Sequence, residues 1–486
     1  MSSINFYCDL AEPTTPFPHF WEHTVGSDHA PAALRADWQQ QLRRCHNELG
    51  FQYVRFHGLL SDDMGTLVRQ DDKLLYSFFN ADQVFDFLLS IGMKPFVELS
   101  FMPRALASGK KTVFNYEANV TPPRDYKQWA TLINRLVSHW MARYGLEEVR
   151  RWYFEVWNEP NLASFWTGTQ RDYFKLYRYT AEAIKKIDKS IRVGGPATAK
   201  SEWIDEFVDF CEKNEVPVDF VSTHYYPTDG FECDDDTEVQ LFKSQRGIMR
   251  EVAQNTRRRA RGLPVYYTEW NSSSNDRDPL HDESYAAAFA VSVIMEAKDL
   301  VDGYSFWSFS DIFEENYFPS RPFHGGFGLL SLHGIPKPTY RGFQLLHDLG
   351  TEQSLVDGLH ETVDCTVIRK QSTVTVLLTN HTTPGHSIET EHIEIRLSNA
   401  FEPVTAHVQR IDDEHVNPRR LWEEMGQPEY LDLKQVEQLE VASRLVHQKQ
   451  LISYEDGILS LETNVPPHGV ASITIEFARE ESGASK

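Results

Sequence analysis

The sequence predicts an α/β protein in which a (β/α)8 barrel is followed by a carboxy-terminal β-sandwich. Three observations indicate this fold class. As far as about residue 350, short runs of β-branched and aromatic residues alternate with amphipathic stretches, which is typical of parallel strands covered by helices. Beyond that point, short alternating runs are separated by turn residues, as in a sandwich. The length of 486 residues also exceeds what one compact core usually holds.

The expected barrel consists of strand and helix units in chain order. An early strand among residues 4–27 comes first, Gly50 and Gly92 supply stop signals for the first two helices, and Asn80 is expected to cap the second helix. Strands are expected at 51–57, 94–100, 153–157, 191–195, 219–226, 264–269 and 303–310, and helices at 33–49, 80–89, 126–144, 172–188, 202–213, 238–254, 283–300 and 339–349. Eight such units close into a barrel whose strand ends share one face. A doubly wound sheet is disfavoured, because no Gly-x-Gly-x-x-Gly fingerprint follows a strand.

Two domains are expected. The barrel would occupy 15–348, and the β-sandwich would occupy 349–486 and be completed by residues 1–14. A helical stretch near 433–448 interrupts the sandwich strands. No cluster of chemically active residues occurs in the sandwich domain, so the expected role of that domain is to pack against the barrel. In the barrel, residues 101–124 are predicted to form a long irregular loop, and such loops in compact domains are usually functional.

The composition restricts the partners. Asp and Glu number 71 against 48 Lys and Arg, and the net charge of −23 argues against nucleic acid or an anionic membrane as the partner. A neutral sugar is compatible with this charge. No secretory signal or long apolar span is visible, which predicts a cytoplasmic protein. The cysteines are odd in number and widely spaced, so we expect reduced thiols without disulfides or a zinc site; they are Cys8, Cys45, Cys211, Cys233 and Cys365.

The strongest candidates for a functional site are two glutamates that each end a buried strand. Glu159 follows an apolar aromatic run and precedes Pro160, which cannot continue a β-ladder. Glu269 ends the run at 264–268 in the same way. One such glutamate is usually just solvated by a loop, but two at the rim of a barrel are the minimal set for glycoside hydrolysis. Counted from the early strand they end the fourth and seventh strands, so they should face each other across the mouth.

Several motifs occur in a recognisable order: YVRFHG at 53–58, KPFVELS at 94–100, WNEPN at 157–161, TEWN at 268–271 and FHGGFGLL at 323–330. Together they resemble the catalytic domain of glycoside hydrolase family 39, the family of retaining β-xylosidases and α-L-iduronidases. The resemblance covers residues 22–350 and is looser in the sandwich. It implies that no cofactor is needed and allows a homo-oligomer, although no apolar stripe in the sequence marks an interface.

The resemblance implies a role for each carboxylate. Glu159 would be the general acid/base, protonated when the glycosidic oxygen leaves and ionised when it activates water. Glu269 would be the nucleophile that forms a covalent glycosyl-enzyme. Retention would require the two carboxyl groups to lie about 5–5.5 Å apart. Asn158 would bond the sugar 2-hydroxyl, although an Asn at this place is equally typical of a turn.

Three further polar residues are implied as substrate-binding. His57 would contact ring hydroxyls from the end of its strand. Metal binding is the competing interpretation, which the absence of His-Glu-x-x-His and of clustered His and Cys spacing disfavours. His224 and Tyr226 resemble the polar pair around the acid/base and the nucleophile, although each alone is more typical of an ordinary rim residue.

The remaining implied contacts are aromatic and acidic. Trp307 would form an apolar platform under the sugar, and Phe114 and Phe165 would wall the pocket, although aromatic residues in barrel strands are more often plain core. Glu315 resembles the carboxylate that binds the outer hydroxyls of the terminal sugar and closes the pocket for exo-action. Its neighbour Glu314 is the alternative by one position.

The sequence therefore predicts a retaining exo-glycosidase, with β-xylosidase as the preferred specificity and short oligosaccharides as substrates. The alternatives are another exo-glycosidase on the same scaffold, namely an arabinosidase, a β-glucosidase or an α-L-iduronidase, or a non-catalytic barrel that only binds carbohydrate. One position departs from the xylosidases: Ser274 stands where they carry a tyrosine that steadies the nucleophile, which leaves the sugar preference open. No basic residue beside the motifs would grip a uronate, which disfavours the iduronidase branch.

Overall fold

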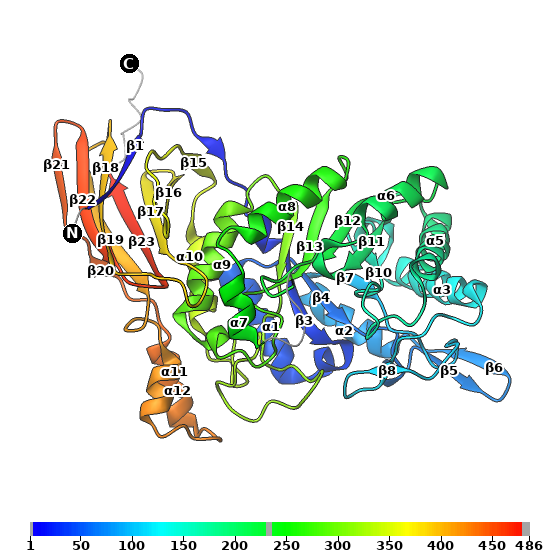
Figure 1. Cartoon of the computed structure of the whole chain (residues 1–486). Coiled ribbons are helices and arrows are strands. Elements are labelled where there is room, and N and C mark those ends of the chain that lie inside the picture. The colour runs from blue at the N-terminus through cyan, green and yellow to red at the C-terminus, as the bar shows by residue number, and fades with distance from the viewer. Residues whose placement is uncertain (1–2, 230–235, 479–486) are drawn as a thin grey trace, which may run out of the picture.

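The larger part of the chain is a closed barrel of parallel strands (Figure 1). The structure is a computed structural model that describes residues 3–229 and 236–478. Around the ring the strands follow the order β10-β11-β12-β13-β14-β3-β4-β7. They are β3 (Thr24–His29), β4 (Tyr53–His57), β7 (Lys94–Leu99), β10 (Tyr153–Val156), β11 (Arg192–Thr198), β12 (Phe220–His224), β13 (Val265–Trp270) and β14 (Gly303–Phe306). The predicted barrel is confirmed, and β3 is the early strand that closes it.

Helices on the outside of the barrel cover the strands. Local signals set several of their ends: α1 ends at Gly50, which has a φ of 77°, and α5 begins with a capping box between Thr169 and Asp172. The helices are α1 (Ala36–Leu49), α2 (Phe79–Ser90), α3 (Tyr126–Tyr144), α4 (Leu146–Val149), α5 (Gln170–Ile187), α6 (Ile204–Lys213), α7 (Thr237–Lys243), α8 (Ile248–Arg259), α9 (Ser284–Glu296) and α10 (Pro338–Asp348).

Three local expectations were wrong. Asn80 does not cap α2, because the helix begins at Phe79 and Asn80 lies within its first turn, where its amide donates to the carbonyl oxygen of Met64 at 3.1 Å. The single helix expected at 238–254 is split into α7 and α8, since Gly247 takes the left-handed conformation with a φ of 84° and starts a new helix. The loop at 101–124 is not wholly irregular. Within it, β8 (Thr112–Val113) pairs with β9 (Ala118–Asn119) as a short hairpin. An earlier hairpin, of β5 (Leu67–Gln70) and β6 (Lys73–Tyr76), also extends from the barrel.

The rest of the chain forms two further sheets and a helical hairpin beside the barrel (Figure 1). One sheet contains, in order, β1 (Ile4–Asp9), β18 (Glu391–Ser398), β22 (Ile458–Val465) and β21 (Ile452–Glu455). The other contains β2 (Thr15–Pro16), β15 (Glu352–Ser354), β16 (Val363–Lys370), β17 (Thr373–Asn380), β23 (Gly469–Phe477), β19 (Pro403–Ile411) and β20 (Gln448–Lys449). The hairpin of α11 (Pro418–Glu424) and α12 (Leu433–Ala442) projects from them, and α11 was not anticipated.

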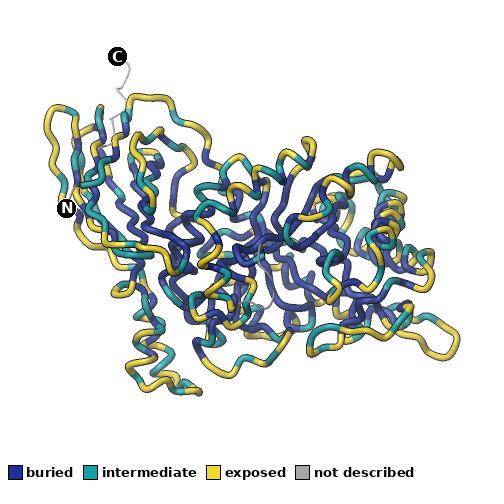
Figure 2. The backbone as a smooth tube through the Cα atoms, in the orientation of Figure 1, coloured by how far each residue is buried: buried dark blue, intermediate teal, exposed yellow. Residues whose placement is uncertain are grey.

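Buried residues concentrate along the barrel strands and, separately, along the strands of the two sheets (Figure 2), where they form two hydrophobic cores. The two interiors meet where α9 packs against β17 and β23. We propose the domain limits 15–348 and 349–486, the second completed by residues 1–14. The pairing of β1 with β18 supports this division, while the pairing of β2 with β15 shows that Thr15 and Pro16 also belong to a sheet of the second domain. Residues 479–486 of the second range lie outside the described residues.

Candidate active site

The carboxyl ends of the barrel strands meet at one mouth, where the structure has a cavity of about 490 Å³. β10 is the fourth barrel strand in chain order and β13 the seventh, with β11 and β12 between them. Glu159 and Glu269 therefore approach this mouth from different sides, as expected. His224 lies behind Glu159, and the other predicted site residues line the cavity: Glu159, Glu269, His57, Phe114, Asn158, Phe165, Tyr226, Trp307 and Glu315.

The two carboxylates lie close together. An oxygen of Glu159 and an oxygen of Glu269 are within 4.8 Å of each other. His224 Nδ1 lies between them, 3.0 Å from Glu159 Oε1 and 3.5 Å from Glu269 Oε2. Retaining glycosidases separate their carboxyl groups by about 5–5.5 Å and inverting ones by about 6.5–9.5 Å. The spacing fits the retaining geometry.

Hydrogen-bond donors surround Glu269. Arg55 Nη1 donates to its Oε1 at 2.7 Å, and the Tyr226 hydroxyl donates to its Oε2 at 3.0 Å. His57 Nε2 lies 3.6 Å from Oε1. Donors of this kind favour the ionised form of a carboxylate. The position of Glu269 is therefore fixed from two directions.

Arg55 is the buried centre of this network. Besides Glu269 it contacts Glu155, whose Oε2 accepts from Nε at 2.5 Å, and Glu98, whose Oε2 lies 2.8 Å from Nη2. Burial opposes the charged form, but these carboxylates outweigh it and raise the pKa of Arg55. Nη2 also donates to Asn158 Oδ1 at 3.0 Å, which leaves the amide nitrogen of Asn158 to donate into the cavity.

A chain of hydrogen bonds fixes the proton positions around Glu159. The Thr268 hydroxyl donates to Glu155 Oε1 at 2.8 Å, so towards His224 Nε2, 3.1 Å away, it can only accept. His224 therefore carries its proton on Nε2. In a neutral ring, Nδ1 is then an acceptor, and it faces Glu159 Oε1 at 3.0 Å. This arrangement is satisfied when Glu159 is protonated.

The pKa directions agree with that assignment. Burial, followed by the negative charges of Glu269 and Asp229, raises the pKa of Glu159 well above its usual value. Burial, followed by the charge of Arg55, lowers the pKa of His224 well below its usual value. Two carboxylates in one cavity thus have opposite environments, which is how acid and nucleophile roles are separated.

Aromatic rings form one wall of the cavity. The Trp307 ring lies 4.8 Å from the His57 ring, between centroids, and Phe114 lies 5.4 Å from Phe165. Trp307 follows β14 rather than lying within it, because the strand ends at Phe306. Such rings suit the C–H faces of a pyranose.

Glu315, and not Glu314, reaches the cavity. Its Oε1 lies 3.3 Å from His57 Nε2, and burial, followed by the charges of Asp28 and Glu269, raises the pKa of Glu315 well above its usual value. Glu314 turns outward and pairs with Arg35 at 2.5 Å. The structure therefore favours Glu315 over Glu314 as the cavity residue, as the sequence did.

Sequence reasoning missed three charged residues beneath the cavity: Arg55, Glu98 and Glu155. Each lies inside a barrel strand whose other residues are mostly apolar, and each is at most 1% exposed. A charge in a fully buried strand requires a partner. That signal was present in the quoted motifs, but the partners could not be paired without the barrel.

Two further features of the cavity bear on the sugar preference. Lys200 lines it, so a basic residue does reach the site, although it lies far from the motifs in sequence. Ser274 also lines it, and its hydroxyl bonds Thr228 at 3.0 Å rather than the nucleophile. The hydroxyl that steadies Glu269 comes instead from Tyr226.

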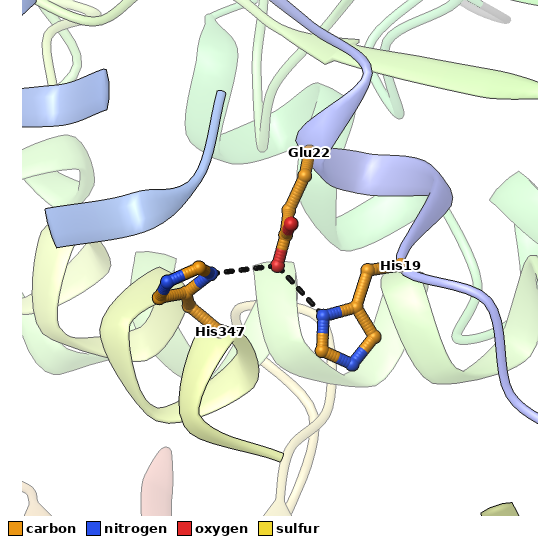
Figure 3. A group of neighbouring side chains, drawn as sticks. All are labelled: His19, Glu22 and His347. Carbon is orange, nitrogen blue, oxygen red and sulfur yellow. Dashed lines mark hydrogen bonds and ion pairs between the residues drawn. The ribbon is translucent and has the colours of Figure 1, made fainter. Parts of the chain in front are cut away.

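Two groups of described residues bring three potential metal-ligand atoms within 4.8 Å of one another. One is Glu159, His224 and Glu269, where Glu159 bonds His224 and Glu269 bonds Arg55 and Tyr226. The other is His19, Glu22 and His347 at the opposite end of the barrel (Figure 3), where both Nδ1 atoms approach Glu22 Oε1, at 2.7 and 2.8 Å. Hydrogen bonds account for both groups.

Within residues 3–229 and 236–478, the cysteines Cys8, Cys45, Cys211 and Cys365 form no disulfide. Cys233, also predicted to be reduced, lies outside the described residues. No helix in the same ranges is long and apolar enough to cross a membrane.

A parallel barrel with two close carboxylates of opposite environment at its mouth defines the class of glycoside hydrolases. Comparison with known proteins gives the family: the description "Glycosyl hydrolases family 39" matches residues 5–457. This chain belongs to glycosyl hydrolase family 39.

Individual relatives agree with this assignment. A protein of Caldicellulosiruptor saccharolyticus named Beta-xylosidase is 50% identical over 466 residues, covering 94% of this chain and 95% of the relative. Another of that name from Geobacillus stearothermophilus is 37% identical over 487 residues, covering 96% and 94%. A solved family 39 Beta-xylosidase from Caulobacter crescentus is 33% identical, with a TM-score of 0.82 over 97% of this chain and 99% of that one.

Proposed function

We propose that this enzyme is a retaining exo-β-xylosidase that removes terminal xylose from short oligosaccharides. The observation that carries the reaction class is the pair of carboxylates within 4.8 Å, one favoured as an acid and the other as an anion. Two full-length relatives named Beta-xylosidase, at 50% and 37% identity, support the choice of sugar.

In the first half-reaction, Glu159 gives its proton to the glycosidic oxygen while Glu269 attacks the anomeric carbon. The bond from that carbon to the leaving oxygen breaks, and a covalent glycosyl-enzyme ester forms on Glu269. Arg55 and Tyr226 keep Glu269 aimed at the sugar. Loss of the proton leaves Glu159 ionised, with its oxygens facing the vacated leaving-group side.

In the second half-reaction, the ionised Glu159 takes a proton from water, whose oxygen attacks the same anomeric carbon and displaces Glu269. Two inversions restore the original configuration. The amide nitrogen of Asn158 would donate to the sugar 2-hydroxyl, a contact that strengthens in the oxocarbenium-like transition state. His57, Trp307 and Glu315 would hold the terminal sugar.

A panel of nitrophenyl glycosides with a mechanism-based fluoro-xyloside tests this proposal. We expect release from the β-xyloside above all, trapping of Glu269 as the ester by mass spectrometry, and retained configuration by NMR. Glu269→Ala should abolish turnover, and Glu159→Ala should slow poor leaving groups by about 10²–10⁴-fold, the usual contribution of a general acid.

Other outcomes would identify the rivals. Brisk release from an arabinoside, β-glucoside or iduronide with negligible xyloside turnover would replace the proposed sugar. Absence of turnover from every sugar, with measurable binding of oligosaccharides, would favour a non-catalytic barrel.

We also propose a cytoplasmic location and self-association into a homo-oligomer. The unpaired state of the four described cysteines supports a reducing compartment. Cell fractionation tests the first proposal, and light scattering of the purified enzyme tests the second.

A further inference from the structure

The segment that follows β11 has an unusual backbone. Positive φ angles occur at Ala197 (53°), Lys200 (61°), Ser201 (51°) and Trp203 (58°). Such a residue is strained and persists only where the surroundings impose its conformation, most often at functional sites. Four of them within seven residues (197–203) indicate that this segment has been shaped for a purpose other than stability.

Contacts tie this segment to the loop that carries the acid/base. The backbone N–H of Glu159 donates to the carbonyl oxygen of Ala197 at 2.8 Å, and the N–H of Ala199 donates to Asn161 Oδ1 at 2.9 Å. The strained segment and the acid/base loop are thus one unit. A residue presented by this segment keeps a fixed position relative to Glu159.

Lys200 is the charged residue that the segment presents to the cavity. It is half-buried and lines the cavity. Across residues 3–229 and 236–478, its ammonium group makes neither a hydrogen bond nor an ion pair. Its charge is felt by Asp229, on the same side of the cavity, where it opposes the burial that raises the pKa of Asp229 to about 7. A half-buried ammonium with three unused donors is suited to binding an incoming group.

The order of strands around the barrel places Lys200 away from the terminal sugar. His57 ends β4 and Trp307 follows β14, and these strands flank β3. In the closed ring of eight strands, β11 lies directly opposite β3. Lys200 therefore faces the wall of His57 and Trp307 from across the mouth, next to Glu159. The acid protonates the leaving oxygen, so this is the side on which the leaving group lies.

We propose that Lys200 forms a binding subsite for the second sugar of the substrate, donating hydrogen bonds to hydroxyl or ring oxygens of the leaving group. This inference rests on the proposed exo-glycosidase function and names the part of the substrate that the catalytic pair does not contact. The ligand class is a neutral pyranose, since the cavity also contains Glu269 and Asp276, whose negative charges would disfavour an acidic sugar.

The test compares two substrates of the full-length enzyme. Xylobiose has a sugar as its leaving group and nitrophenyl β-xyloside has an aromatic ring, while both share the terminal sugar. In Lys200→Met, we expect the ratio of kcat/KM for xylobiose to that for the aryl xyloside to fall about tenfold or more, as expected for loss of a charge-assisted hydrogen bond. Lys186→Met on the exposed face of α5 is the matched control and should leave the ratio unchanged.

A second variant and a second readout separate binding from backbone strain. Lys200→Asn suits the left-handed conformation but is too short to reach the sugar, so it should lower the ratio as Lys200→Met does. Both variants should also reduce the fraction of the glycosyl-enzyme that reacts with added xylose rather than with water. A purely structural role would change turnover of both substrates together and leave this fraction as it is.

The outcomes distinguish the two levels of the proposal. If the wild type cleaves both substrates and neither variant changes the ratio or this fraction, the subsite is wrong and the glycosidase function stands. If the wild type cleaves the aryl xyloside only, the subsite is also wrong. If it cleaves neither, the proposed function itself fails.

Discussion

Removing one buried hydroxyl should move the pH dependence of the reaction. Thr268 is 1% exposed and accepts the Nε2 proton of His224 while donating to Glu155. In Thr268→Val, that N–H loses its acceptor, which costs about 1–3 kcal/mol. The ring can avoid this cost by carrying its proton on Nδ1, where it would donate to ionised Glu159. If the ionised form of Glu159 gains about 1.4 kcal/mol in this way, the pKa of Glu159 falls by about one.

The assay is kcat/KM against pH with a xyloside that has a poor leaving group. The basic limb of this profile reports protonated Glu159 in the free enzyme. Since the pKa of Glu159 falls in the variant, the basic limb should lie about one pH unit lower than in the wild type. Thr223→Val is the control, because Thr223 is equally buried but its hydroxyl donates to the carbonyl oxygen of Thr198. An unmoved basic limb in Thr268→Val, with normal folding, would refute the assignment of the His224 proton.

Two further predictions concern stability. Arg55→Met leaves three buried carboxylates without their common cation, and breaking buried pairs in this way costs about 3–5 kcal/mol; the urea midpoint should fall accordingly, and an unchanged midpoint would contradict the ion-pair network. At the other end of the barrel (Figure 3), the hydrogen bond to Glu22 raises the pKa of His347, so its stabilising effect is complete below about pH 6.5 and is lost as pH rises through the raised value. For Glu22, burial is outweighed by bonds to His19 and His347, which lower its pKa, so its effect is present above about pH 4.5 and is lost as pH falls through the lowered value. His347→Gln should therefore lower the melting temperature most between about pH 4.5 and 6.5. The loss of free energy of unfolding should be no more than about 1 kcal/mol, because the imidazole is partly exposed. A difference in melting temperature between variant and wild type that grows above pH 7 would contradict this.

The sequence was sufficient for features that depend on neighbours along the chain. Apolar runs identified the barrel strands, although the strand that delivers Glu159 ends at Val156, three residues earlier than Pro160 had suggested. The count of strand and helix units then placed Glu159 and Glu269 at the ends of the fourth and seventh strands, because parallel strands with right-handed crossovers bring their ends to one face. Gly50 likewise ended its helix where expected.

Other features depended on conformations or contacts that no pattern reports. Gly247 split an expected helix because it adopted the left-handed conformation, whereas a glycine within a helical pattern is also compatible with a continuous helix. Asn80 does not cap its helix because α2 begins one residue earlier, at Phe79. These errors arise where one sequence pattern is compatible with two local conformations.

By itself, the sequence determined the barrel, its two acidic strand ends and the aromatic wall, because hydrophobic periodicity and the Gly and Pro residues that end helices and strands are local properties of the chain. Only the tertiary structure decided that Arg55 joins Glu98, Glu155 and Glu269, and that a strained turn directs Lys200 into the cavity. The reason is physical: a charge in a buried strand must find a partner, but which partner it finds depends on how the closed ring brings non-adjacent strands together.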